Sequence, residues 1–322
     1  MGSAIRLKDI IMKIAIIGSG LSGLACADHL RAAGHEIALF DKARGPGGRM
    51  STRRMASAIG DISFDHGAQY FTARDPAFVS IVREWEKSGV AGRWPVAGDE
   101  AWVGVPAMNA PIKALAAGHN VTWSTRIIKM VKADAGWQLQ TDDGLIDTVF
   151  DQVICAIPAE QAADLLLPWE PNFASIASAT LSDPCWTLML AFDQPSGIAD
   201  PIFRDDVTIG WAARNSDKPG RDGPETWVVQ ASPEWSRVHL EDSPEDVTAA
   251  LSDHFAELAG VSLPPPLVVS AHRWRYARSG RTDSSALYSD EHKLGVCGDW
   301  MIGPRIECAW LSGRALAQMI LA

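Results

Sequence analysis

The sequence has no pair of cysteines spaced as CxxC, and none of its cysteines stands with a histidine at metal-ligand spacing. Its five cysteines are Cys26, Cys155, Cys185, Cys297 and Cys308, each in an apolar context. Such isolated thiols are typical of a reducing compartment. We therefore expect reduced core thiols in a cytoplasmic protein, and no metal site.

The sequence also lacks an apolar run near the roughly 20 residues that a membrane helix needs, as well as internal repeats and low-complexity segments. Its net charge of −10 argues against a nucleic-acid binder. The 322 residues, 47% of them hydrophobic, predict a globular protein of about two domains. Residues 1–11 precede a second methionine, Met12, and we interpret them as a tail or a cloning scar.

The segment KIAIIGSGLSGLACADHLRAAGHEIALFDK, residues 13–42, has the pattern of a strand, a turn, a helix and a second strand. The apolar run 13–17 predicts a buried parallel strand. Residues 21–33 are rich in helix formers and are followed by Gly34, which is typical of a helix C-terminus. Residues 36–40 predict the next strand.

The glycines of this segment, Gly18, Gly20 and Gly23, form GxGxxG. In this motif the first glycine permits the tight turn, the second lets the backbone approach a pyrophosphate, and the third lets the helix pack closely on the strand. Asp41 ends the second strand, where it can accept hydrogen bonds from ribose hydroxyls. The pattern predicts a dinucleotide site, without separating a nicotinamide cofactor from FAD.

The stretch FDKARGPGGRMSTRR, residues 40–54, favours FAD. Gly47 and Gly48 can run against a cofactor, and Arg49 can form charge-assisted bonds to phosphates. Here the sequence resembles the glutathione-reductase-like flavoproteins of the amine-oxidase branch, whose RxGGR-type element lies along the FAD. In this chain one extra residue follows Arg44. No attachment residue is evident, so we expect the FAD to be non-covalent.

The far end, residues 293–322, predicts a strand at 294–297, the pair Gly298-Asp299, and a helix to the C-terminus with Pro304 early in it. In the flavoproteins that this sequence resembles, such a Gly-Asp pair binds the ribityl chain and the helix start faces the isoalloxazine C2 carbonyl. Motif and resemblance together imply cofactor contacts from Gly18, Gly20, Leu21, Ser22, Gly23, Asp41, Lys42, Arg44, Gly48, Arg49, Ala68, Gln69, Ile127, Gly298, Asp299, Arg305, Ile306 and Glu307.

The predicted fold class is α/β, with a Rossmann-like FAD-binding domain of the glutathione-reductase/amine-oxidase type and a second, mixed-sheet α+β substrate domain. We assign residues 12–76, 111–160 and 270–322 to the FAD domain, and residues 77–110 and 161–269 to the substrate domain. Within the second domain, the SPED sequence at Ser243 predicts a capped helix start.

Two further stretches, FDHGAQYFTARDPAF at 64–78 and HRWRYARSG at 272–280, resemble bacterial renalase-type flavoproteins. The resemblance implies a small-molecule substrate: the 2- and 6-dihydro isomers of nicotinamide dinucleotides, oxidised with O2 as acceptor and hydrogen peroxide as product. An amine oxidase or a desaturase is the alternative. A flavin-binding protein with a redox-sensing or structural role is a third hypothesis.

Hydride loss from a dihydronicotinamide leaves an aromatic ring, so such a site needs orientation and no catalytic base. Amine oxidases commonly carry a lysine in the strand pattern K-x-x-x-x-F, and here CWTLMLAF places Thr187 at that position. If residues 272–278 form a strand, its aromatic residues share one face and Arg273 and Arg275 the other. We expect substrate contacts from Gln69, Tyr70, Trp186, Thr187, Trp211, Trp274, Arg275 and Tyr276.

Overall fold

The computed structural model describes residues 11–322, so all but the last residue of the predicted tail lies outside the described residues. The chain forms two compact units. Of the described residues, the first comprises 11–48, Ile112–Leu181 and Ser279–Ala322, and the second comprises Arg49–Pro111 and Ser182–Arg278. Residues 49–76 and 270–278, which the sequence-based boundaries assign to the FAD domain, cluster with the second unit, and residues 161–181, assigned to the substrate domain, cluster with the first.

The first unit is built on a six-stranded sheet in the order β17-β18-β11-β1-β2-β7. Its strands pair in parallel, except that β17 runs antiparallel to β18. The strands are β1 (Lys13–Ile17), β2 (Glu36–Phe40), β7 (Val121–Thr122), β11 (Gln152–Cys155), β17 (Leu287–Ser289) and β18 (Leu294–Val296). The strands at 13–17 and 36–40 are confirmed, and so is the predicted α/β fold class.

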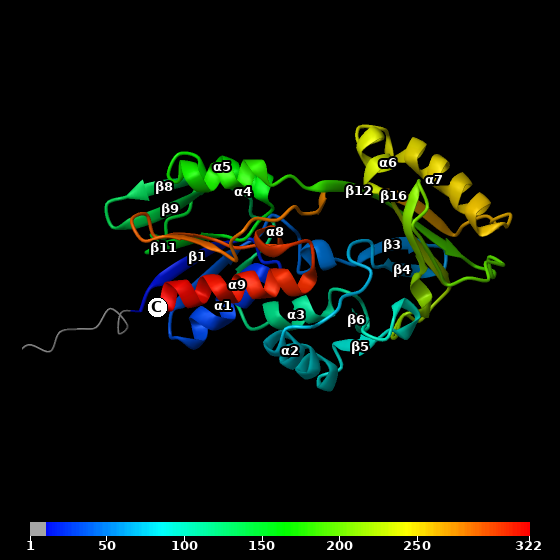
Figure 1. Cartoon of the computed structure of the whole chain (residues 1–322), viewed down its shortest axis with the longest axis horizontal. Coiled ribbons are helices and arrows are strands. Elements are labelled where there is room, and N and C mark those ends of the chain that lie inside the picture. Colours follow the sequence, from blue (N-terminus) through cyan, green and yellow to red (C-terminus); the bar gives the residue numbers. More distant parts are fainter. Residues whose placement is uncertain (1–10) are drawn as a thin grey trace, which may run out of the picture. The chain divides into compact units, whose positions relative to one another are not determined.

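Helices and a small sheet form the other layers of this unit. Helices α1 (Leu21–Ala32) and α9 (Ile306–Leu321) run side by side (Figure 1). Buried residues of β1, β11 and β18 share a hydrophobic core with a three-stranded sheet and two helices. These elements are β8 (Ile127–Ala133), β9 (Gly136–Thr141), β10 (Gly144–Leu145), α4 (Ala159–Leu166) and α5 (Pro171–Ala179). The same core contains Trp300 of α8 (Asp299–Ile302).

The second unit is built on a five-stranded antiparallel sheet in the order β13-β14-β15-β12-β16. The strands are β12 (Asp183–Phe192), β13 (Ile202–Arg204), β14 (Ile209–Arg214), β15 (Glu225–Ala231) and β16 (Val268–Arg278). Helix α7 (Pro244–Ala259) lies against one face of this sheet (Figure 1). Its Leu251 and Phe255 belong to the same hydrophobic core as Trp227 of β15.

The opposite face of this sheet is partly covered by the hairpin of β3 (Arg53–Ser57) and β4 (Gly60–Phe64), through Ile62, Phe64 and Met189. The remaining elements of the unit are α2 (Pro76–Lys87), β5 (Ala91–Arg93), β6 (Trp102–Gly104) and α6 (Pro233–Val238). Helix α3 (Ala110–Ala116) contains a boundary between the two units.

The start of helix α7 agrees with the prediction from the sequence, and the start of helix α9 differs from it. The Ser243 side chain accepts a hydrogen bond from the Asp246 N–H at the start of α7, as its capping pattern predicts. At the far end, Pro304 lies ahead of the helix, because Arg305 is the N-cap and α9 begins at Ile306. The short helix α8, which follows Gly298, was not predicted.

Candidate functional site

The glycine turn after β1 has the shape that a dinucleotide site requires. Gly18 has φ of +102°, and a Cβ at Gly18 or Gly23 would collide with backbone oxygens of Ala156 and Gly18 respectively. Apart from its chain neighbours, a Cβ at Gly20 would meet no atom of the described part of the chain within 4 Å. The first and third glycines therefore permit tight packing, while the second borders open space of the kind a pyrophosphate could enter.

Two polar side chains beside this turn differ in how they are satisfied. The Ser22 hydroxyl is buried and has no hydrogen-bond partner among residues 11–322. Asp41 holds the turn: its Oδ2 accepts from the N–H and hydroxyl of Ser19, at 2.8 and 2.7 Å, and its Oδ1 accepts from the Ala43 N–H at 2.8 Å. A carboxylate accepts about four hydrogen bonds, so Asp41 retains capacity for a ribose hydroxyl. The orphaned hydroxyl and the open Gly20 fit a bound FAD.

The C-terminal elements place further predicted cofactor residues. Asp299 is buried at the start of α8, where it accepts from the Trp300 N–H. Glu307 is buried in the first turn of α9, with its carboxylate 3.4 Å from the Arg305 guanidinium. An acid at this position is favoured by the helix dipole. The predicted flavin contacts of these residues remain predictions.

The other predicted cofactor residues divide between the units. In the first unit, Ile127 is buried, Lys42 donates to Gln161 at 2.9 Å, and Arg44 is exposed. The residues Arg49, Ala68 and Gln69 belong to the second unit, where the Ala68 N–H donates to the Arg49 carbonyl at 2.8 Å. Their contact with the same cofactor stays a prediction.

In the second unit, four side chains form a line across the sheet, from β14 through β15 and β12 to β16. They are Trp211, Gln230, Thr187 and His272, which are paired neighbours in the strand register and which we call the cross-sheet row. Directly paired residues of antiparallel strands point to the same face. Met189 lies two positions from Thr187, and Val228 lies two positions from Gln230, so each points to the same face as its row residue. Both pack under the β3–β4 hairpin, so the row lies on the hairpin side of the sheet.

The loop of residues 65–70 is fastened to this same face. The Gly67 carbonyl accepts from Gln230 Nε2 at 2.7 Å, and the His66 carbonyl accepts from Trp274 Nε1 at 2.9 Å. The Tyr70 ring lies 5.4 Å from the Trp211 ring, centroid to centroid. Loop and row together form what we call the candidate substrate face.

Two histidines of this face are neutral at physiological pH. Burial lowers the pKa of His66 to about 3, and the neighbouring His272 and Arg53 also lower it. Burial, together with Arg53, lowers the pKa of His272 to about 4. The rings are 4.9 Å apart, and Arg53 Nη1 lies 3.2 Å from His272 Nδ1. Because an arginine can only donate, Nδ1 is the acceptor and the neutral His272 carries its proton on Nε2.

The structure places three predicted substrate residues elsewhere. Trp186 alternates with Thr187, so it points to the helix-covered face, where it is buried and donates to the His239 carbonyl at 2.8 Å. Arg275 forms a two-pronged salt bridge with Glu241, at 2.6 and 2.8 Å. The buried side chain of Gln69 accepts a hydrogen bond from Lys218 at 3.1 Å. Trp274 and Tyr276 share the opposite face of β16 from Arg275, as the predicted strand requires.

A buried ionic cluster lies under the loop, and sequence reasoning missed it. Asp65 Oδ2 lies 2.6 Å from Arg221 Nη2 and 3.4 Å from Lys218 Nζ, and all three side chains are at most 6% exposed. Lys218 also donates to Gln69 Oε1 at 3.1 Å. Asp65 Oδ1 accepts from the Thr52 hydroxyl and the Met108 N–H.

The electrostatics of this cluster follow from burial and from its cations. Burial raises the pKa of Asp65, but Lys218, Arg221 and the Met108 N–H outweigh it and bring that pKa down to about 2. Burial lowers the pKa of Lys218, and the neighbouring Arg221 lowers it further. The attraction of Asp65 raises it only in part, so that pKa is about 8. The cluster is therefore charged at neutral pH, with two cations against one carboxylate.

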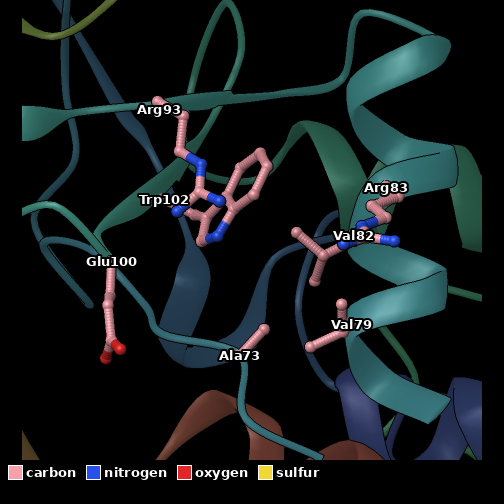
Figure 2. Close-up of a pocket in the computed structure, with 7 residues that line it drawn as sticks. All are labelled: Ala73, Val79, Val82, Arg83, Arg93, Glu100 and Trp102. Atoms are coloured by element: carbon pink, nitrogen blue, oxygen red, sulfur yellow. The ribbon is translucent and has the colours of Figure 1, made fainter. Parts of the chain in front are cut away.

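One surface pocket of the second unit lies at α2, β5 and β6. Figure 2 shows Val79, Val82 and Arg83 on the helix, opposite Arg93 and Trp102. The Arg93 guanidinium stands 3.8 Å over the Trp102 ring. None of the predicted substrate residues lines this pocket, and Arg93 already covers the face of the Trp102 ring.

Comparison with known families now places the chain. Residues 16–85 match the model of an NAD(P)-binding Rossmann-like domain, and residues 93–321 match that of the flavin containing amine oxidoreductases. The chain belongs to the flavin-containing amine oxidoreductase family. It is an FAD-dependent oxidoreductase, which confirms FAD as the predicted cofactor, while its non-covalent binding stays a prediction.

Solved structures support the fold. A provisionally assigned protoporphyrinogen oxidase from Exiguobacterium sp. 255-15 has a TM-score of 0.76 at 13% identity, covering 96% of this chain and 98% of its own. Cyclohexylamine oxidase from Brevibacterium oxydans IH-35A has a TM-score of 0.69 at 12% identity, covering 97% and 99%. At these identities the likeness concerns the fold alone.

A curated relative matches over a short segment only. A 4,4'-diapophytoene desaturase (4,4'-diaponeurosporene-forming) of Staphylococcus aureus is 50% identical over 40 residues, which is 12% of this chain and 8% of the desaturase. Across residues 11–322, the helices fall short of the length and apolarity needed to cross a membrane.

Proposed function

We propose that this oxidoreductase takes a hydride from the 2- and 6-dihydro isomers of nicotinamide dinucleotides, in a renalase-like reaction in the cytoplasm. The substrate ring loses two electrons and one proton as hydride and becomes a pyridinium. Together with one further proton, these reduce O2 to hydrogen peroxide. The FAD supplies the two-electron acceptor between substrate and O2.

The observation that carries this proposal is the charge of the candidate substrate face. The cross-sheet row contains no carboxylate, and the imidazoles of its His272 and of the loop residue His66 are neutral at physiological pH. Asp65, the carboxylate of the loop, is already paired with two cations. A protonated amine would thus meet no available anion there, whereas Arg53 beside His272 favours an anionic dinucleotide.

The aromatic groups of the face fit the same substrate class. Trp211 has Arg204 over its ring at 4.7 Å, which leaves that side unsuited to a second cation. The Nε2–H of His272 is a neutral donor, of the kind that a carboxamide oxygen accepts. The substrate needs no proton removed before hydride transfer, so orienting groups of this kind suffice.

An amine oxidase or desaturase acting on another small molecule is the second candidate. The family match favours it, and similar structures include cyclohexylamine oxidase. Against it stands Thr187, fully buried in the row at the position where the strand pattern of amine oxidases has a lysine.

The deciding experiment mixes the purified holoprotein, without oxygen, with 2-, 4- and 6-dihydro-NAD(P) and with a panel of primary and secondary amines. We expect bleaching of the flavin absorbance by the 2- and 6-isomers, and hydrogen peroxide after air is admitted. The 4-isomer serves as the matched control, because it has the same charge and size. Bleaching by amines alone, or by no compound in the panel, would overturn the proposal.

A further inference from the structure

We propose that Lys218 is a positioning residue that holds the loop of residues 65–70 against the cross-sheet row. The second step of this inference, an effect on substrate binding, rests on the proposed function. The first step, the ordering of the loop, does not.

Lys218 makes its contacts inside the protein. Its side chain is fully buried, and its Nζ donates to Gln69 Oε1 at 3.1 Å and to Asp65 Oδ2 at 3.4 Å. The Gln69 amide in turn donates to the carbonyls of Asp65, at 2.6 Å, and Gly67, at 3.0 Å. One ammonium group therefore fixes a side chain that bridges two backbone positions of the loop.

The two carbonyls that follow Asp65 face the sheet. His66 and Gly67 receive hydrogen bonds from Trp274 and Gln230, at 2.9 and 2.7 Å. The Gly67 carbonyl accepts from both Gln69 and Gln230, so the Gln69 bridge directly holds one of the two carbonyls that fasten the loop to the sheet. Lys218 thus acts on the candidate substrate face through Gln69, without touching the row itself.

Neutralising the Asp65 carboxylate does not require Lys218. Arg221 alone neutralises Asp65, with Nη2 and Nε at 2.6 and 3.2 Å from Oδ2. Lys218 adds a surplus buried cation, which costs free energy. The hydrogen bond from its Nζ to Gln69 Oε1, at 3.1 Å, is shorter than its 3.4 Å contact with Asp65 and accounts for a lysine at this position.

The test is hydrogen–deuterium exchange of the full-length holoprotein carrying Lys218→Met, which removes the charge and the donor at similar length. We expect amides in peptides covering residues 65–71 to exchange about tenfold faster, as the loss of one buried hydrogen bond implies, with little change elsewhere. Lys87→Met is the control: Lys87 is exposed in the last turn of α2, where its ammonium pairs with Glu84 at 2.6 Å. Unchanged exchange at 65–71, a rise spread evenly over the second unit, or global unfolding would each overturn the positioning role.

Kinetics test the second step. With a 2- or 6-dihydronicotinamide substrate, Lys218→Met should raise KM about tenfold and leave kcat within about threefold, because a displaced loop weakens binding equally in the ground state and the transition state. An unchanged KM would overturn this step. If the wild type oxidises no dihydronicotinamide, the proposed function fails, while the exchange data still decide whether Lys218 orders the loop.

Discussion

Asp65 is the residue on which the second unit's interior charges converge. Its carboxylate receives donors from Thr52, the Met108 backbone, Lys218 and Arg221. The carboxylate is nearly inaccessible, so each of these contacts acts in a medium of low dielectric. The same medium makes any unmatched charge there costly.

Replacing Asp65 with Asn should therefore leave two buried cations without a counter-charge. We expect Asp65→Asn to lower the free energy of unfolding by about 3–5 kcal/mol, measured by urea denaturation at pH 7. The loss should be smaller at pH 9, because Lys218 has a pKa of about 8 and is then largely neutral.

The matched control for this variant is Asp61→Asn, at an exposed position of β4, with an expected change within about 0.5 kcal/mol. A loss below about 1 kcal/mol for Asp65→Asn, or a loss independent of pH, would contradict the assigned charges.

At the scale of elements, the glycines of the turn between β1 and α1 have different roles: Gly23 permits close packing, and Gly20 borders the space for a ligand. Gly20 has φ of −71°, which alanine adopts freely, and its Cβ direction is open. Gly20→Ala should leave the melting temperature of the apoprotein unchanged and weaken FAD binding at least about tenfold, or ~1.4 kcal/mol. Gly23→Ala should instead destabilise the apoprotein by about 1–3 kcal/mol, because its methyl would strike the Gly18 carbonyl.

Thermal melting of the apoprotein and titration with FAD, followed by flavin fluorescence, distinguish these two effects. Equal destabilisation by both substitutions would mean that the space beside Gly20 is not a ligand site.

The elements that could be predicted from the sequence are those whose cause is local. The glycine spacing, the strands beside it and the Ser243 cap each depend on residues a few positions apart, so the pattern contains the information. The interior cluster does not have this property, since Asp65 and Lys218 are 153 residues apart. Trp186 was misplaced for a simpler reason: it and Thr187 are adjacent on a strand, so they cannot face the same side.

At the scale of the whole molecule, the neutral histidines predict how stability depends on pH. The pKa values of His66 and His272 in the folded protein are about 3 and about 4, below their ordinary value of 6.5. As pH falls below 6.5, the unfolded chain therefore binds protons that the folded chain does not. Stability is fully present above pH 6.5 and falls as pH decreases toward 4 and then 3. The depressed pKa of Asp65 adds a further loss between pH 3.8 and about 2.

Urea denaturation of the holoprotein with saturating FAD should thus show a lower midpoint at pH 5 than at pH 7.5. A variant with His66→Gln and His272→Gln should lose less between the two pH values, because its amides do not titrate. Comparing the two proteins cancels the contributions of the other histidines and of FAD binding, which both share. An equal drop in wild type and variant would mean that these imidazoles bind protons at pH 5 in the folded state as they do in the unfolded state. The depressed pKa values of His66 and His272 would then be wrong.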